Sequence, residues 1–397
     1  MRISEIKERL KVHIPAKAEE IFNSGKVDFK DTSLLDEGFM RSVSRKFNVL
    51  REYENEAIKK ALKIKDDEII LAFFNLAVAY LNYANGDVEK SLALNVPDSE
   101  EGEDALDMLP MAIIFTQIEK SYGRYRLMGM NEEDALFHMD AYGNCFKKAS
   151  DLMQRSGLNR MYFNWLCIYL GAGLVTVSGF NFEMKKNPAS AVFIRNKATG
   201  KLLALSFNQK IHKSGNVFMS AGCTDEEGSF IAEYKESDEE FKGYPINEKG
   251  LCEKDEKCYK KSRWEKVLSP GDDVISFHIP KNADLTPANL DKVFSEGIKK
   301  VKEYYRDKSV RCIICGSWLL SPQLWDIMNE KSNIVAFGKR FTLAPMRSAG
   351  KDVFSFVFPP GIKNYEELPE NTTLERGLKK LYLEGKYLYT FYGAFEI

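Results

Sequence analysis

The sequence predicts an α+β protein of two domains, in which an all-helical first half precedes a second half of alternating strands and helices. The chain has 397 residues, which is more than one ordinary hydrophobic core accommodates. Until about residue 180, apolar residues recur at the three- and four-residue spacing of amphipathic helices. Beyond that point, short apolar runs alternate with turn residues, as they do in strands. We therefore assign residues 1–180 to a helical domain and residues 181–397 to a domain built on a sheet.

Four helices are predicted in the first half from their caps and apolar spacing. Asp66 and Asp67 can cap a helix over residues 68–85, which the glycine that follows can end. A second helix is expected to begin near Pro110, because proline at the first helical position loses no hydrogen bond. A third begins at Asn131, which precedes acidic residues that favour a helix N-terminus. The almost wholly apolar stretch 161–174 predicts a central, buried helix.

The second half is predicted to open with a β-hairpin and to continue with alternating elements. Residues 191–195 and 201–207 are short apolar runs on either side of a turn that contains Gly200. Further strands are predicted over residues 217–221, 274–279, 310–315, 334–343, 353–358 and 387–395, and helices over residues 287–305, 322–328 and 372–384. The charged segment 234–266 is expected to form loops with a helical piece.

The segment 274–315 has the order strand, helix, strand, and two strands joined in this way within one sheet form a parallel pair. Open sheets with parallel strands bind ligands beyond the carboxyl ends of those strands. His278 ends the first of the two strands, and Ser317 and Trp318 follow the second. These residues are therefore the first candidates for a functional site.

Charge and hydropathy argue against several classes of protein. Lys and Arg total 57 and Asp and Glu total 58, so the formal net charge is −1 and no global field attracts nucleic acid or an anionic membrane. The most apolar stretch, 69–81, is shorter than the roughly 20 residues that a membrane span needs. The N-terminus lacks the apolar segment of a secretory leader. The seven scattered cysteines are typical of reduced thiols, so we expect a cytoplasmic protein that binds neither nucleic acid nor a membrane.

Several local sequences in the second half resemble those of one bacterial family. The segments concerned are Pro270-Gly271-Asp272 before VISFHIP, then CIICGSWLLSPQL and SNIVAFGKRF, with Gly243-Tyr244-Pro245 and Trp264 upstream and Thr373-Leu374-Glu375-Arg376 near the end. This combination resembles acyltransferase domain-containing proteins, in which an N-acyltransferase N-terminal domain precedes a GNAT-like C-terminal domain. The resemblance implies a GNAT-like mixed sheet flanked by helices. It also implies transfer of an acyl group from acyl-CoA to an amine of a small molecule or peptide.

The resemblance also implies roles for particular residues near the two central strands. His278 is expected to deprotonate the amine, and Ser317 or an ordered water to protonate the leaving thiolate. The residues expected to hold acyl-CoA are Ile279, Lys281 and Thr286, and those expected to wall the substrate pocket are Trp318 and Tyr244. Thr286 can also cap the helix that begins at Pro287. The alternative for the histidine is a ring that orders a loop, and for the two aromatic residues it is packing on the sheet.

Two features depart from the pattern of the family and define an alternative function. Gly316 stands where the family has histidine, so a polar group is missing. GNAT enzymes also carry a glycine-rich loop whose backbone N–H groups hold the CoA pyrophosphate. Here the loop reads IPKNADLTPANL, without glycine and with two prolines, which have no N–H to donate. The alternative is a non-catalytic protein that binds a ligand or partner on a degenerate GNAT frame.

The cysteines are not expected to form a metal site. Cys312 and Cys315 lie three residues apart in a predicted strand, so their side chains point to opposite faces. Cys252 and Cys258 lie in a charged segment with no histidine nearby, whereas a zinc site needs about four ligands. A redox or zinc module built on these loop cysteines is the weakest of the three functions considered.

Overall fold

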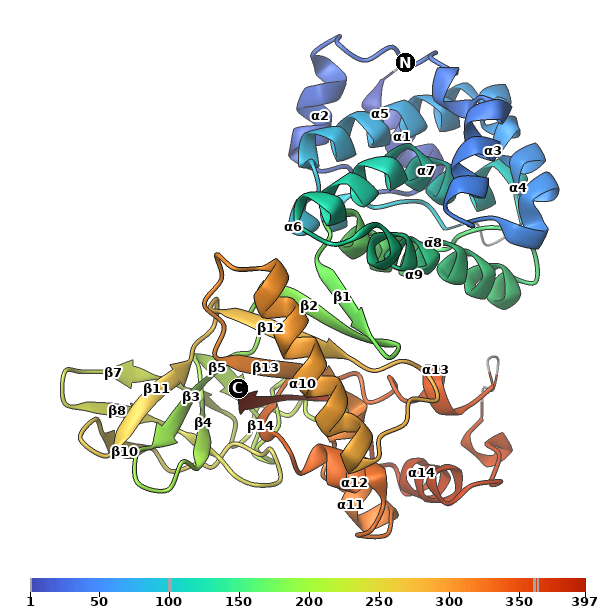
Figure 1. Ribbon diagram of the computed structural model, residues 1–397. Coiled ribbons are helices and arrows are strands. Elements are labelled where there is room, and N and C mark those ends of the chain that lie inside the picture. Colours follow the sequence, from blue (N-terminus) through green and yellow to red (C-terminus); the bar gives the residue numbers. More distant parts are fainter. Residues whose placement is uncertain (1, 99–101, 360–361, 363) are drawn as a thin grey trace. The chain divides into compact units, whose positions relative to one another are not determined.

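The computed structural model describes residues 2–98, 102–359, 362 and 364–397 of the chain (Figure 1). Contacts between residues divide the chain into two compact units, Met1–Val175 and Thr176–Ile397. The first unit is helical, and the second contains a mixed sheet with helices on one of its faces. The predicted fold class, a helical region followed by a mixed sheet flanked by helices, is confirmed.

The helical unit is a succession of α-helices, some of which are linked by turns of 3-10 helix. The helices are α1 (Ile3–Leu10), α2 (Ala16–Asn23), α3 (Glu37–Lys46), α4 (Glu54–Leu62), α5 (Glu68–Ala84), α6 (Val88–Ala93), α7 (Asp104–Leu127), α8 (Glu132–Met153) and α9 (Arg160–Leu170). The carboxylate of Asp67 accepts the backbone N–H groups of Ile69 and Ile70 at 2.9 and 3.0 Å, so α5 begins where its cap predicts. Asn131 caps α8 in the same way. Within the described residues, every helix is too short or too polar to span a bilayer.

Two predictions for this unit are corrected by the structure. Pro110 lies inside α7, which begins at Asp104, so the proline interrupts one hydrogen bond within the helix instead of opening it. The helix predicted over residues 161–174 ends at Leu170. Gly171 is its C-cap, and Ala172 then adopts a left-handed backbone with φ of 51°, so the helical conformation does not continue.

The second unit is organised around a six-stranded sheet with the order β1-β2-β12-β13-β15-β14. Its strands are β1 (Leu174–Val177), β2 (Phe180–Lys186), β12 (Asp273–His278), β13 (Cys312–Ser317), β14 (Thr342–Pro345) and β15 (Phe391–Glu396). β12 and β13 are parallel, as predicted from the strand–helix–strand order. β12 pairs antiparallel with β2, and β15 pairs antiparallel with both β13 and β14.

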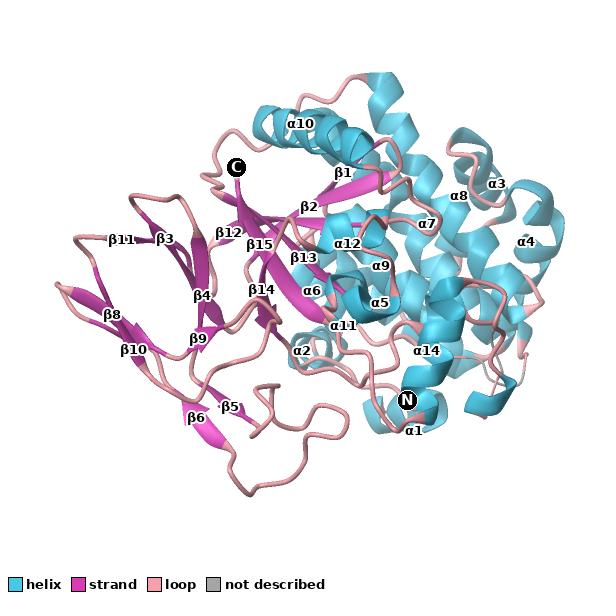
Figure 2. Ribbon diagram, turned by 90° about the horizontal axis from the view of Figure 1, so that it is seen from below, coloured by secondary structure: helices cyan, strands magenta, loops and turns pink. Residues whose placement is uncertain are grey.

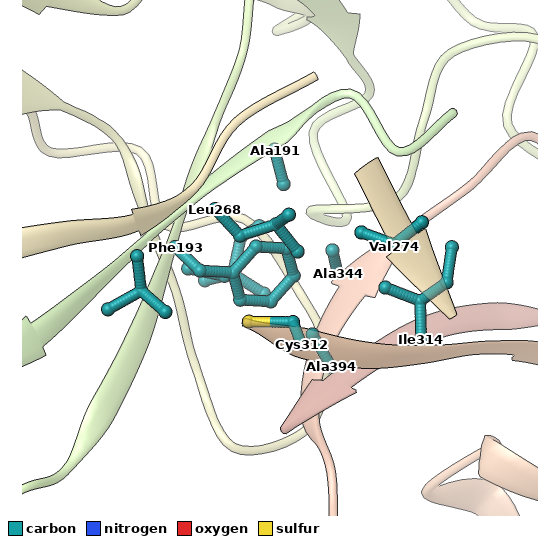
Figure 3. Packing of buried hydrophobic residues seen from close by; sticks show 11 residues of the cluster. Ala191, Phe193, Leu268, Val274, Cys312, Ile314, Ala344 and Ala394 are labelled. Carbon is teal, nitrogen blue, oxygen red and sulfur yellow. The ribbon is translucent and has the colours of Figure 1, made fainter. Parts of the chain in front are cut away.

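A second, four-stranded sheet packs against one face of the first. It has the order β11-β3-β4-β9, and its strands are β3 (Ala191–Asn196), β4 (Leu202–Ser206), β9 (Pro245–Ile246) and β11 (Trp264–Leu268). β3 and β4 are the predicted hairpin. Figure 3 shows Phe193 and Leu268 of this sheet packed against Cys312 and Ile314 of the first. Burial of these apolar side chains on both sides fixes the two sheets together.

Two small sheets complete the strands of this unit. They are β10-β8-β7 and β5-β6, formed by β5 (Gln209–Ile211), β6 (Phe230–Ala232), β7 (Lys235–Glu236), β8 (Glu240–Gly243) and β10 (Lys257–Lys260) (Figure 2). The segment 234–266 therefore contains strands and no helix, contrary to the prediction. Its strands were hidden because charged residues occupy them. Lys242 of β8, for example, pairs with Glu256 beside the start of β10, 2.7 Å away.

Helices cover the other face of the six-stranded sheet. α10 (Pro287–Tyr304) packs Phe294 against Phe277 of β12, with ring centroids 4.7 Å apart. Gly297 brings α10 close to the sheet, since a Cβ there would lie 2.1 Å from the ring of Phe182. The short helix α12 (Asn333–Gly338) adds Phe337 to the same aromatic layer.

A further cluster of short helices lies beyond β13. Its helices are α11 (Gln323–Ile327), α13 (Phe354–Val357) and α14 (Thr373–Leu383). Thr372 and Glu375 form the predicted capping box of α14, with hydrogen bonds of 3.1 and 2.6 Å to each other's backbone N–H groups.

Three strand predictions in this unit are wrong. Residues 353–358 contain the helix α13, and the predicted strand 334–343 begins with α12 before reaching β14. Short apolar runs do not distinguish a buried helix from a strand, and the cap that Ser332 gives α12 was overlooked. Residues 217–221 form turns, with a single bridge from Val217 to Ile211.

Candidate functional site

The two parallel strands of the sheet separate towards their carboxyl ends. β12 and β13 pair at only two positions, of which the last is Ser276 opposite Ile314. Beyond it, β12 remains paired with β2 as far as His278, and β13 remains paired with β15 as far as Ser317. The backbone ladder is therefore open between β12 and β13 at this end, and we call this opening the β12–β13 splay. It lies at the edge where parallel sheets bind ligands.

The register of the strands decides which side chains share a face at the splay. Residues that are paired across a sheet share a face, and faces alternate along each strand. Since Ser276 is opposite Ile314, the residues two positions on, His278 and Gly316, lie on that same face. Tyr392 is paired with Gly316 and joins them. One row across β12, β13 and β15 thus consists of a histidine, a glycine and a tyrosine.

His278 is held by a buried carboxylate on the neighbouring strand. Its Nε2 lies 2.8 Å from Oε2 of Glu183 on β2. The side chain of Glu183 is 4% exposed and that of His278 is 30% exposed, so the imidazole connects the interior with the surface. Because a carboxylate only accepts hydrogen bonds, we assign the ring proton to Nε2, which leaves the lone pair of the neutral ring on Nδ1.

The carboxylate of Glu183 is ionised in this environment. Burial alone raises the pKa of Glu183, but the hydrogen bonds and charges of His278 and Lys185 outweigh burial and hold it below the usual value. Nζ of Lys185 lies 3.2 Å from the same oxygen that His278 contacts. The carboxylate of Glu183 thus lies between the ammonium group of Lys185 and the imidazole of His278, on the face that carries the histidine.

Glu183 was not predicted as a site residue, because β2 itself was not predicted. The signal is present in the sequence FNFEMKK, where apolar and polar residues alternate. The apolar set Phe180, Phe182 and Met184 alternates with the polar set Asn181, Glu183 and Lys185. A strand assigned here places the carboxylate on one face, although its partner on β12 remains unknown without the register.

Ser317 and Trp318 serve the structure after β13. The hydroxyl of Ser317 accepts the backbone N–H of Leu319 at 3.1 Å and so caps a turn of 3-10 helix over Trp318–Leu320. Alternation along β13 places Ser317 on the face opposite to His278 and Gly316. Trp318 is 9% exposed and packs in the cluster of short helices, with Phe356 at 6.2 Å between ring centroids.

The loop between β12 and α10 carries the residues predicted to hold acyl-CoA. Ile279 is half-buried and Lys281 is exposed. Thr286 occupies the N-cap position of α10, but its side chain makes no capping hydrogen bond, so the expected cap is not formed. Instead, the backbone N–H of Thr286 donates to the carboxylate of Asp284 at 2.9 Å. The chain thus supplies its own anion at the start of this helix.

The side chain of Arg340, a cation, lies at the first turn of α10. Arg340 contacts the carboxylate of Asp291 at 2.6 Å and donates to the carbonyl oxygen of Pro287 at 3.3 Å. It comes from the segment between α12 and β14 and was not predicted as a site residue. Arg340 is therefore fixed beside the helix N-terminus, where the helix dipole also favours an anion.

Tyr244 lies in a different part of the unit. It packs against Phe230, with ring centroids 5.3 Å apart, at a buried cluster of Ile211, Ala232 and Cys252. This cluster is centred on β5 and β6, and the structure does not bring it together with His278. Among the residues that the structure describes, there is no group of three or more His, Cys, Asp or Glu side chains able to hold a metal ion.

The chain resembles known proteins in its sequence family and in its fold. The family model of the GNAT-like C-terminal domain matches residues 182–395, in accord with the resemblance found in the sequence. No curated protein matches the sequence. Among solved structures, an acyltransferase in complex with decanoyl-CoA and teicoplanin is 14% identical with a TM-score of 0.67, covering 100% of this chain and 99% of that one. An acyltransferase mutant in complex with octanoyl-CoA is 13% identical with a TM-score of 0.65, covering 100% of both chains.

Proposed function

Because the chain belongs to the GNAT-like C-terminal domain family, we propose that it is an acyltransferase that moves an acyl group from acyl-CoA to an amine. The observation that carries this proposal is His278, anchored on Glu183, at the open end of two parallel strands. The solved structures with the same fold are acyltransferases with decanoyl-CoA or octanoyl-CoA bound, which supports a long acyl donor. One of them also holds teicoplanin, which supports a small-molecule or peptide acceptor.

The β12–β13 splay suits the extended arm of acyl-CoA. The backbone edges of β12 and β13 are not paired with each other beyond Ser276 and Ile314, so a chain with amide groups can take the place of a strand between them. The thioester carbonyl would then lie beside the backbone at His278 and Ile279. A backbone N–H at this position would stabilise the negative charge that develops on the carbonyl oxygen.

The phosphates of CoA would lie at the N-terminus of α10. Lys281 and Arg340 supply two cations, and the helix dipole adds partial positive charge. Since the loop has no glycine, side-chain charge replaces the backbone cradle of other GNAT enzymes in this proposal. The carboxylate of Asp284 would be displaced from the backbone N–H of Thr286 when the phosphates bind.

His278 would act as the general base. An alkyl amine has a pKa of about 10.4 in water, so it must lose a proton to attack a thioester at neutral pH. The ring can accept that proton on Nδ1 while Nε2 remains bound to Glu183. The ionised carboxylate then stabilises the imidazolium that forms. Glu183 acts through the histidine and is a positioning residue.

Direct binding of CoA, acetyl-CoA, octanoyl-CoA and decanoyl-CoA by calorimetry tests the proposal on the full chain. We expect micromolar binding with a preference among chain lengths. Lys281→Ala and Arg340→Ala should each weaken binding about 3- to 10-fold, with a smaller loss at high salt. Asp284→Ala should tighten binding, because it removes the competing anion. Lys257→Ala is the matched control, since this exposed lysine lies on β10 and pairs with Glu253.

A non-catalytic binding protein is the second candidate function. It is favoured by the anion that the chain itself places at the start of α10, because Asp284 occupies a donor that a phosphate would use. No binding at millimolar CoA, by the parent chain and by Asp284→Ala alike, would exclude the acyltransferase and leave this alternative. Binding of acyl-CoA without release of the CoA thiol in a screen of amines would likewise argue against catalysis.

A further inference from the structure

We infer that a pocket at the C-terminal end of α10 binds a small phosphate monoester. The pocket has a volume of about 320 Å³ and is formed by the last turn of α10 and the segment that leads to β13. Three basic side chains, a serine and a tyrosine line it together with two valines. The inference is independent of the proposed function, because it concerns a second site.

The pocket lies far from the place proposed for the phosphates of CoA. That place is the N-terminus of α10, at Pro287, whereas the pocket begins at Val301 near the other end of the same helix. α10 has 18 residues, and a rise of 1.5 Å for each residue separates its two ends by about 27 Å. The two places are therefore separate sites.

The cations of the pocket have no acidic partner. Lys302, Arg306 and Lys308 are exposed, and none of them forms an ion pair with a residue that the structure describes. Nε of Arg306 donates to the carbonyl oxygen of Glu303 at 2.9 Å, which holds the guanidinium at the pocket and leaves its two Nη groups for a ligand. Three positive charges thus gather around one cavity without a negative charge to balance them.

The end of the helix explains only part of this charge. The helix dipole favours cations within the last turn, and Lys302 lies there. Arg306 and Lys308 follow the helix, so the dipole does not account for them. The segment 299–311 has six basic residues and two acidic ones, although the whole chain is almost neutral. An anion in the pocket would relieve the repulsion between these charges.

The pocket also has an apolar wall and neutral donors. Val301 is buried, and Val310 and the ring of Tyr305 are half-buried. Burial raises the pKa of Tyr305, so its phenol carries a proton at neutral pH. The hydroxyl of Ser309 is a further donor. The backbone N–H of Lys308 donates to the carbonyl oxygen of Tyr305 at 3.0 Å, and this turn holds the segment against the end of the helix.

The size and charge of the pocket define the class of ligand. Its volume corresponds to about ten water molecules at roughly 30 Å³ each, which is more than inorganic phosphate fills. A phosphate monoester carries a charge of about −1.5 to −2 at pH 7 and three acceptor oxygens, so it suits three cations better than a carboxylate does. The apolar wall suits a compact organic group attached to the phosphate. Phenyl phosphate has both parts and is a suitable probe.

The test is a nuclear magnetic resonance titration of the isotope-labelled full chain with phenyl phosphate at neutral pH. We expect a Kd of about 0.1–1 mM, as is usual for so small a ligand, with the largest shifts at the backbone amides of residues 301–310. Phenol and inorganic phosphate should bind at least about tenfold more weakly, because each lacks one of the two parts. Phenyl sulfate, which carries a single charge, should bind about threefold more weakly or worse, and equal affinity for it would overturn the assignment to a phosphate monoester.

Variants of the exposed cations connect the binding to the pocket. Arg306→Gln and Lys308→Gln should each weaken the binding of phenyl phosphate about 3- to 10-fold. Lys299→Gln is the matched control, since it removes the same charge from an exposed lysine of α10 that does not line the pocket, and it should change the affinity less than about twofold. Circular dichroism verifies that the variants are folded.

The outcomes separate the inference from the proposed function. Equal affinity in the parent chain, Arg306→Gln and Lys308→Gln would overturn the inference, and so would the absence of shifts at residues 301–310. Shifts at residues 284–291 instead would place phenyl phosphate at the N-terminus of α10, which contradicts the inference and supports the proposed site for CoA. A chain that binds phenyl phosphate at residues 301–310 but binds no acyl-CoA would uphold the inference and exclude the proposed function.

Discussion

β12 and β13, the two parallel strands on either side of the β12–β13 splay, end in different ways. At the end of β12, the side chain of His278 is joined to a buried, ionised carboxylate and still reaches the surface. At the end of β13, the hydroxyl of Ser317 accepts a hydrogen bond from the backbone N–H of Leu319, and Trp318 packs in a cluster of short helices. The sequence alone made both ends candidates. The contacts that each side chain makes support a chemical role at the first end in the proposed function, and they give the second end a structural role.

The largest effect should distinguish the two ends by activity. His278→Ala should lower kcat/KM for acyl transfer about 10²- to 10⁴-fold, because it removes the proposed general base. Ser317→Ala should change it less than about threefold, since the hydroxyl caps a turn on the other face. The measurement is release of the CoA thiol at saturating amine, with circular dichroism to verify folding. Similar losses in both variants would remove the distinction.

The next effect should distinguish the two ends by stability. Trp318→Ala should lower the free energy of unfolding by about 3–5 kcal/mol, because the side chain is 9% exposed and leaves a cavity in its cluster. Urea denaturation measures the change, followed by far-ultraviolet circular dichroism because this backbone signal does not depend on the tryptophan. A small change in stability together with a raised KM for acyl-CoA would instead assign Trp318 to the pocket wall.

The smallest effect concerns Glu183, whose carboxylate contacts His278 at the end of β12. The pKa of Glu183 in the folded chain lies below its ordinary value of 4.5, so the ionised group contributes stability above that pH and loses it as pH falls through the folded value. Below about pH 5, the free energy of unfolding of the parent chain should therefore fall more steeply than that of Glu183→Gln. Urea unfolding at several pH values between 5 and 3 checks this. Parallel curves would mean that the pKa of Glu183 is the same in the folded and the unfolded chain.

The fold followed from local signals wherever these were strong. Caps at Asp67, Asn131 and Thr372 located α5, α8 and α14, and the pattern of residues 274–315 gave the parallel pair around α10. The same approach failed for α12 and α13, since their short apolar runs suit either a helix or a strand.

The candidate site was only half predictable, because its contacts are between distant segments. His278 was found from its position after a strand. Its partner Glu183 and the row through Gly316 to Tyr392 depend on strand register, which the order of elements does not determine. Arg340 was missed for the same reason, as nothing near it in the sequence points to the first turn of α10.

β2 and β12 are neighbours in the sheet, yet residues 187–272, with strands β3 to β11, lie between them in the chain. Closing so long a loop costs entropy before the pairing of the two strands repays it, and such non-local pairing slows folding. Glu183 and His278 are supplied by the two sides of this insertion. The dyad should consequently form late, after the inserted strands have found their own partners. A nascent or partly folded chain would hold neither partner in place, so the contact between Glu183 and His278 should form only as the last part of the sheet closes.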